Sequence, residues 1–262
     1  MNRQTFWQRV KQLFAPVLVA LAAGAKWFVV LFKVGWPFFK MAGLMFISLW
    51  VYAQAFGWRF AAGFIVLLFV HESGHLLAAR MVGLKVGLPV FIPFMGALIA
   101  LKEAPRNAWI ESIVGIGGPI LGSLGALGVA ACYSFTGNPI FLALGYTGFF
   151  LNLFNLIPIV PLDGGRIVSA ISPWLWVVGL VILVPYLFLY VHGPFIFIPL
   201  LIVITSIPRV LALFRRRTPE QMRYFECTAV QRLVMAVLYF GLLASLYLGM
   251  GYLKRLMGSE SF

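Results

Sequence analysis

The chain has 262 residues, of which 62% are hydrophobic and only 10% are charged, and its mean hydropathy is +0.99. Soluble globular domains carry roughly 25% charged residues, so this composition excludes an ordinary water-soluble fold. The net charge of +13 would suit nucleic-acid binding, but the Lys and Arg residues flank apolar runs and form no basic face, so we expect no nucleic-acid partner. The long apolar runs instead predict helices that cross a lipid bilayer.

The first 40 residues are both basic and apolar. Lys26, Lys33 and Lys40 recur every seventh residue, so they would share one face of a helix. This pattern favours an amphipathic segment, residues 1–40, that lies on the cytoplasmic leaflet with its lysines near anionic headgroups. The alternative is a true span over residues 13–32 that contains one lysine.

The apolar runs that follow predict an all-α polytopic membrane protein with about six to seven transmembrane helices. The candidate spans lie near residues 41–57, 60–82, 109–134, 139–161, 168–190, 195–212 and 229–252. An N-terminus in the cytoplasm puts most basic residues on the cytoplasmic side, as the positive-inside rule requires. That side receives Arg80, Lys85, Lys102, Arg106, Arg166, Arg209, Arg215, Arg216, Arg217 and Arg223, whereas the outer side receives Arg59, Lys254 and Arg255.

The stretch from Leu84 to Leu101 is apolar but contains Pro89, Pro93 and Gly96, which break a spanning helix. Apolar chain without helical structure is tolerated at membrane depth only where it is buried in protein or lines a cavity. We therefore expect a small membrane-embedded β-strand or re-entrant hairpin over residues 96–101.

The most informative pattern is His71-Glu72-Ser73-Gly74-His75, an H-E-x-x-H sequence at the end of an apolar run. Residues four apart share a helix face, so both imidazoles can reach one metal ion. A carboxylate beside the first ligand can take a proton from water at that metal. Ionisable groups near bilayer depth are costly unless they are partnered, so the pattern favours a functional zinc site over structural burial.

A catalytic zinc needs a third protein ligand and one open position. Asp163 is the only aspartate in the chain, and the span before it would end on the same membrane side as the motif helix. Asp163 could instead be a turn or N-cap residue and not a metal ligand, because Asp-Gly-Gly suits a turn before a helix. Glu103 and Glu111 are rival ligands, although Glu111 could instead pair with Arg106 or face the headgroups.

Taken together, these motifs resemble the site-2 protease family of intramembrane metalloproteases. The resemblance rests on His71–His75 followed by Asn155-Leu156-Ile157-Pro158-Ile159-Val160-Pro161-Leu162-Asp163-Gly164-Gly165, and it extends to Gly96-Ala97-Leu98-Ile99 and Gly117-Gly118-Pro119. It covers roughly residues 41–170. The sequence shows no PDZ or CBS domain, which many family members carry.

The resemblance implies that His71, His75 and Asp163 hold a single Zn²⁺ per chain and that Glu72 is the general base. It implies that Asn155 lies near the active site and helps to hold the substrate or the oxyanion. A polar residue that bonds helices together is the competing interpretation of Asn155.

Two further roles concern neighbouring segments. Asn152, one turn before Asn155, is interpreted as a residue that joins helices. The segment Gly96, Ala97, Leu98 and Ile99 resembles the family's β element, which would bind an unwound substrate by strand addition.

The expected function is therefore that of an intramembrane zinc metalloprotease, which hydrolyses peptide bonds in or near transmembrane segments of membrane-protein substrates. Residues 41–170 would form the catalytic transmembrane core, and residues 171–262 would add helices and a basic cytoplasmic loop. The protein would be a multi-pass component of a prokaryotic cell membrane, with the active site nearer the cytoplasmic side. A membrane metal transporter and a zinc-stabilised scaffold are the alternatives.

Overall fold

The computed structural model describes residues 43–92, 96–101, 103–190, 196–216 and 218–259. The chain divides into two compact units, Met1–Leu44 and Met45–Phe262, so almost all described residues belong to the second unit. The basic segment expected over residues 1–40 lies outside the described residues.

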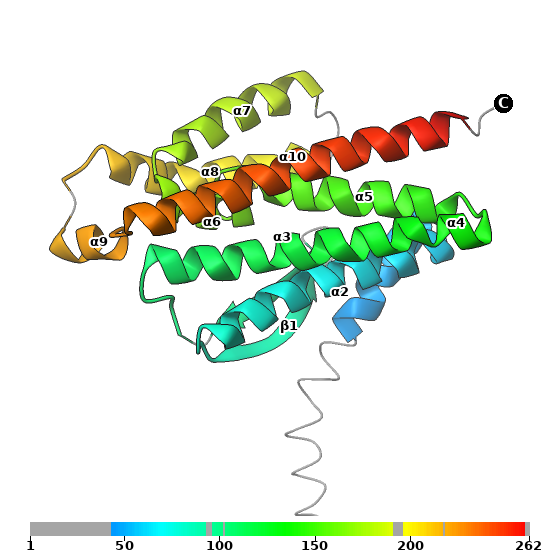
Figure 1. The fold of residues 1–262 in the computed structure, drawn as a ribbon, viewed down its shortest axis with the longest axis horizontal. Helices are drawn as coiled ribbons and strands as arrows, with labels where there is room; N and C mark the ends of the chain where they lie inside the picture. The colour runs from blue at the N-terminus through cyan, green and yellow to red at the C-terminus, as the bar shows by residue number, and fades with distance from the viewer. Residues whose placement is uncertain (1–42, 93–95, 102, 191–195, 217, 260–262) are drawn as a thin grey trace, which may run out of the picture. The chain divides into compact units, whose positions relative to one another are not determined.

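The second unit is mainly helical, as the apolar runs predict. A helix over Gly43–Phe56 precedes the elements labelled in Figure 1. The helices are α2 (Trp58–Met81), α3 (Ala108–Ala131), α4 (Tyr133–Thr136), α5 (Ile140–Asn155), α6 (Asp163–Ile171), α7 (Leu175–Tyr190), α8 (Phe197–Leu213), α9 (Pro219–Tyr224) and α10 (Ala229–Ser259). The strands are β1 (Val86–Ile92) and β2 (Gly96–Leu101).

The central helix of this unit is α3, which contacts α2, α5 and α6 (Figure 1). Helix α10 contacts α5 and α6 as well as α3. The main apolar core is built from side chains of these helices and of the chain between α5 and α6, among them Leu67, Ile116, Leu142, Leu156 and Ile167. This packing brings α2 and α6 against the same helix, although they are far apart in the sequence.

Of the two structures expected over residues 96–101, the strand is present as β2. β1 and β2 form a two-stranded antiparallel sheet in which Ile92 lies opposite Gly96 and Val90 opposite Leu98, with an irregularity between Val86 and Pro89. Both strands contact α2. The hairpin is thus beside the helix that carries the H-E-x-x-H motif.

Three helical segments of the described chain are long and apolar enough to cross a membrane: α2, α3 continued through α4, and α10. Four further apolar helices are shorter, namely Gly43–Phe56, Ile140–Asn155, Leu175–Leu189 and Pro199–Leu213. The expected span over residues 168–190 is wrong as a single helix. Ser172 and Pro173 separate α6 from α7, because proline disfavours a helical conformation in the residue before it. The helix in the region of the span expected over residues 139–161 is shorter than that expectation, since α5 ends at Asn155.

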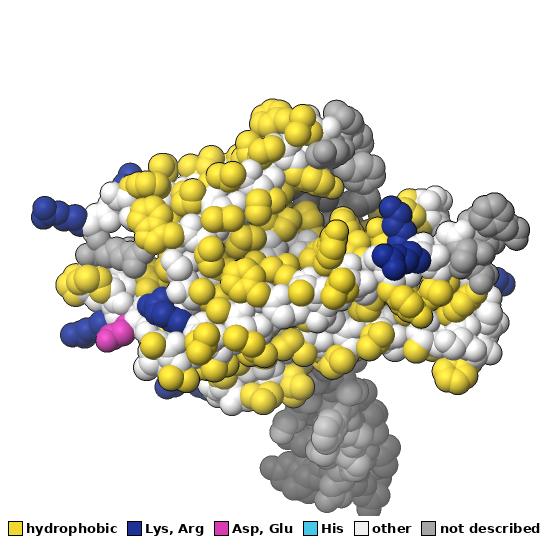
Figure 2. Space-filling view, turned by 45° about the horizontal axis from the view of Figure 1, so that its top comes forward, with side chains coloured by type: hydrophobic (Ala, Val, Ile, Leu, Met, Phe, Trp, Pro, Cys, Tyr) yellow, Lys and Arg dark blue, Asp and Glu magenta, His cyan; other side chains and the backbone are white. Residues whose placement is uncertain are grey.

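The surface is apolar over much of its extent. Figure 2 shows hydrophobic side chains across the middle of one face, whereas Lys and Arg side chains lie mainly towards its ends. Helix α10 exposes Leu233, Phe240, Tyr247 and Leu248 among other large apolar residues. Large contiguous apolar surfaces are unusual on water-soluble monomers, so this surface agrees with a protein that sits in lipid.

Candidate metal centre

Helix α2 presents the H-E-x-x-H motif in its second half. His71, Glu72 and His75 are all buried, although most side chains of this helix are apolar. The two imidazole rings lie on one helix face with their centroids 4.9 Å apart. The helix ends at Met81, and the turn that follows contains Gly83, whose φ of 76° is a left-handed conformation that glycine adopts without strain.

Asp163 is the first residue of α6 and is also buried. The backbone cap of this helix is Leu162, and no side chain caps it, so the alternative role of Asp163 as an N-cap is wrong. The chain between α5 and α6 contains Pro158 and Pro161 and has no helical structure. This interruption frees the carboxylate to point away from its own helix.

Two side chains from other helices hold the segment around Asp163. Trp176 Nε1 donates a hydrogen bond to the Gly165 carbonyl over 2.8 Å, and the Tyr239 hydroxyl donates to the Leu156 carbonyl over 2.6 Å. A side chain at Gly165 would overlap the backbone of Ile159 and Val160. The close approach of two backbone segments therefore requires glycine here.

His71, His75 and Asp163 converge on one point. Asp163 Oδ2 lies 3.1 Å from the Nε2 atom of each histidine, and the two Nε2 atoms are 3.2 Å apart. Within the described part of the chain, this is the only group of three or more His, Cys, Asp or Glu side chains arranged to hold a metal ion.

The geometry of this triangle fits zinc. Three ligand atoms that hold one Zn²⁺ at about 2.0–2.2 Å in tetrahedral directions lie about 3.3–3.6 Å from one another, which is close to the 3.1–3.2 Å found here. Lone pairs this close repel one another unless a proton or a metal ion lies between them. Two imidazoles and one carboxylate suit zinc and leave one coordination position open.

The outer nitrogen of each histidine faces a carbonyl oxygen. Asn152 donates through Nδ2 to the Gly148 carbonyl, so its Oδ1 accepts from His71 Nδ1 over 2.7 Å. His75 Nδ1 donates to the Val114 carbonyl over 2.8 Å. Protonation of both Nδ1 atoms leaves the Nε2 lone pairs free for a metal, the arrangement typical of histidine ligands.

The interpretation of Asn152 was therefore incomplete. It does join α5 to α2, but it does so through His71, the first residue of the motif. The sequence signal was present as a polar residue in the last turn of an apolar helix. Only the fold shows that its partner is a histidine distant in sequence.

The Gly117-Gly118 pair allows α3 to lie in close contact with α2. A side chain at Gly117 would overlap the Gly74 carbonyl and Ala78, and a side chain at Gly118 would overlap the imidazole of His75, including Nε2. The two glycines let α3 approach the motif helix closely enough for Val114 to accept the hydrogen bond from His75.

The rival ligands lie elsewhere. Glu103 pairs with Lys85 over 3.0 Å at the surface. Glu111 accepts a hydrogen bond from the Tyr224 hydroxyl over 2.6 Å and lies 3.7 Å from Arg166. The partners of Glu111 are therefore Arg166 and Tyr224, from α6 and α9, in place of Arg106, which the sequence had offered as one alternative.

The remaining predicted residues are placed as follows. Glu72 is buried next to the first histidine of the motif. Asn155 is the last residue of α5 and is partly exposed, three residues after Asn152. Gly96, Ala97, Leu98 and Ile99 lie in β2.

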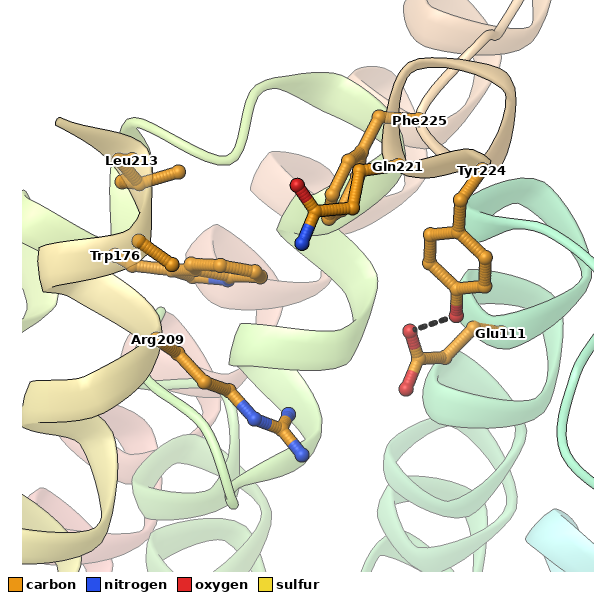
Figure 3. Close-up of a pocket in the computed structure, with 8 residues that line it drawn as sticks. Glu111, Trp176, Arg209, Leu213, Gln221, Tyr224 and Phe225 are labelled. Carbon is orange, nitrogen blue, oxygen red and sulfur yellow. Dashed lines mark hydrogen bonds between the residues drawn. The ribbon is translucent and has the colours of Figure 1, made fainter. Parts of the chain in front are cut away.

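A cavity of about 330 Å³ lies where α3 begins and α8 ends (Figure 3). Its walls include Glu111, Tyr224, Trp176 and Arg209. Tyr224 and Glu111 form a hydrogen bond on one wall, and the guanidinium of Arg209 points into the space opposite them (Figure 3). Trp176 links this cavity to the Asp163 segment through its bond to Gly165.

The fold and the site define a class of protein: a helical membrane protein with a buried His-His-Asp centre suited to zinc. Residues 59–138 and 136–176 match the sequence profile of peptidase family M50. This part of the chain is similar to peptidase family M50, the family of the site-2 proteases.

Two curated proteins are similar to this chain. One is a zinc metalloprotease of Methanocaldococcus jannaschii, 32% identical over 121 residues, which cover 43% of this chain and 35% of that protein. The other is a putative zinc metalloprotease of Synechocystis sp., 34% identical over 107 residues, which cover 38% of this chain and 28% of that protein. The similarity thus spans about a third of the length of these relatives.

Proposed function

We propose that the protein is an intramembrane zinc metalloprotease that hydrolyses peptide bonds in or near transmembrane segments of other membrane proteins. The observation that carries the proposal is the buried convergence of His71, His75 and Asp163 with the Glu72 carboxylate beside them. The family match and the names of the two relatives support the same activity.

In this proposal His71, His75 and Asp163 hold the zinc ion. A zinc ion in such a site supplies a Lewis acid that lowers the pKa of a bound water towards about 7 and polarises the scissile carbonyl. Glu72 accepts the proton of the attacking water and returns it to the leaving amine.

The substrate enters as an extended segment. A helical substrate hides its carbonyls in its own hydrogen bonds, so local unwinding comes before cleavage. In a two-stranded sheet each strand has one edge that its partner does not cover. We propose that the segment Gly96–Ile99 of β2 pairs with the unwound substrate by strand addition, and that Asn155 helps to hold the substrate or the oxyanion.

The proposed setting is a prokaryotic cell membrane, with the active site nearer the cytoplasmic side. The positive-inside rule puts three arginines of the described chain on the cytoplasmic side. These are Arg80 in the last turn of α2, Arg166 in the first turn of α6 and Arg223 in the last turn of α9. Single-span and signal-anchor proteins would then be substrates whose products are released to the cytoplasm.

Removal of the metal tests this function. Purified protein is reconstituted in liposomes with a library of single-span peptides, and products with new termini are identified by mass spectrometry. We expect cleavage in the zinc-loaded protein, loss of cleavage after treatment with a chelator, and recovery when zinc is restored.

The same liposomes separate the alternatives. Zinc uptake into the vesicle lumen without any new peptide termini would support a metal transporter and contradict the protease. Cleavage that persists after complete removal of the metal would contradict the zinc mechanism. A catalytic site must also keep one position open, whereas a structural zinc has four protein ligands.

A further inference from the structure

The two carboxylate oxygens of Asp163 face different partners. Oδ2 lies between the two histidine Nε2 atoms, whereas Oδ1 faces an amino group of Arg166 at 3.9 Å. A guanidinium can bind both oxygens of a carboxylate at once. A two-point contact of this kind with Arg166 would draw Oδ2 away from the histidines.

Arg166 lies between two carboxylates. Its Nε atom is 3.7 Å from Glu111 Oε1, and both side chains are about one-fifth exposed, at 21% and 20%. These separations are too long for hydrogen bonds but close enough for strong attraction in a partly buried environment. Among the described residues, Asp163 and Glu111 are the carboxylates within ion-pair reach of Arg166.

Glu111 is itself held in place. Tyr224 donates to Glu111 Oε2 over 2.6 Å (Figure 3), a charge-assisted hydrogen bond. Burial and then the neighbouring carboxylate raise the pKa of Tyr224 above its usual value, so the hydroxyl remains a donor. Tyr224 ends α9, a short helix whose start is fixed by a capping box between Thr218 and Gln221.

We propose that Glu111 is a positioning residue for the metal centre: held by Tyr224, it keeps Arg166 at the outer oxygen of Asp163 and leaves Oδ2 free for the ion. The proposal rests on the proposed zinc site. Without Glu111, Arg166 has Asp163 as its remaining carboxylate among the described residues. Its guanidinium can then move to a two-point contact that competes with zinc for Oδ2.

Zinc affinity tests the proposal without any activity assay. Competition with a chromophoric chelator measures the zinc dissociation constant of the full-length protein. We expect Glu111→Gln to weaken zinc binding by about tenfold, a magnitude typical of changes in residues that orient metal ligands. Tyr224→Phe should weaken it in the same direction by a smaller factor. Glu220→Gln, which changes an exposed carboxylate on α9, is the matched control and should bind zinc as the wild type does.

A double-mutant cycle shows whether Glu111 acts through Arg166. In an Arg166→Gln background, Glu111→Gln should cause no further loss of zinc affinity. The visible spectrum of bound Co²⁺ should also differ between Glu111→Gln and the wild type, because the contacts of Asp163 change.

Three results would overturn the inference. Equal zinc affinity in Glu111→Gln, Tyr224→Phe and the wild type would show that no positioning occurs. An equal loss on Glu111→Gln in both backgrounds would show a general structural role instead. A folded wild type that binds no zinc would remove the proposed function as well, whereas the first two results leave that function intact.

Discussion

Replacement of Glu72 by glutamine is expected to slow cleavage by several orders of magnitude while zinc remains bound. Glutamine has nearly the same size as glutamate but cannot accept a proton from water at neutral pH. General acid–base catalysis contributes typically about 10²–10⁴-fold to a rate, so the cleavage rate should fall by about that factor. The measurement is the initial rate of product formation in liposomes, with bound zinc determined on the same preparation.

Ser73→Ala is the control for this variant. Ser73 lies in the same helical turn, and its hydroxyl donates to the Phe69 carbonyl of its own helix. The control should keep both zinc and activity. Cleavage by Glu72→Gln at the wild-type rate would disprove the mechanism, and loss of zinc in this variant would mean that Glu72 acts on the metal site itself.

Replacement of Gly118 by alanine is expected to have a comparably large effect, on metal binding. The new methyl group would overlap His75 at Nε2, the atom that faces the other ligands. His75 cannot turn away freely, because its Nδ1 is bound to the Val114 carbonyl. We expect zinc affinity to fall by about 10–100-fold, as when an imidazole ligand loses its orientation, in the same chelator competition assay.

Gly128→Ala is the matched control on the same helix. A side chain at Gly128 meets no atom within 4 Å, and alanine is favoured over glycine inside a helix by about 0.5–1 kcal/mol. This variant should bind zinc normally and unfold at an equal or higher temperature. Equal zinc affinity in the two alanine variants would contradict the contact of α3 with the metal site.

The sequence was sufficient to place the candidate site because its two parts are local patterns. His71 and His75 share a helix face by spacing alone. The prolines and glycines around Asp163 predict a break in helical structure before a new helix begins. Their meeting follows from packing of α2 and α6 against α3, and the family resemblance supplied that step before the structure did.

The residues that support the site were harder to predict. Asn152 was expected to join helices, but its contact with His71 depends on which faces of α2 and α5 pack together, and no local sequence pattern gives that. Glu111 and Tyr224 meet across a long stretch of sequence. The sequence also predicted one span over residues 168–190. The run is largely apolar, but the structure has a break between α6 and α7 at Pro173.

The central claim is that both motifs build one zinc site, and bound zinc per chain tests it most directly. Elemental mass spectrometry is applied to the purified wild type and to Asp163→Ala. We expect about one zinc per chain in the wild type and a clear loss in the variant, because three protein ligands are needed to hold a catalytic zinc. Unchanged zinc in Asp163→Ala would contradict the role of Asp163, and a well-folded wild type that binds no supplied zinc would contradict the account as a whole.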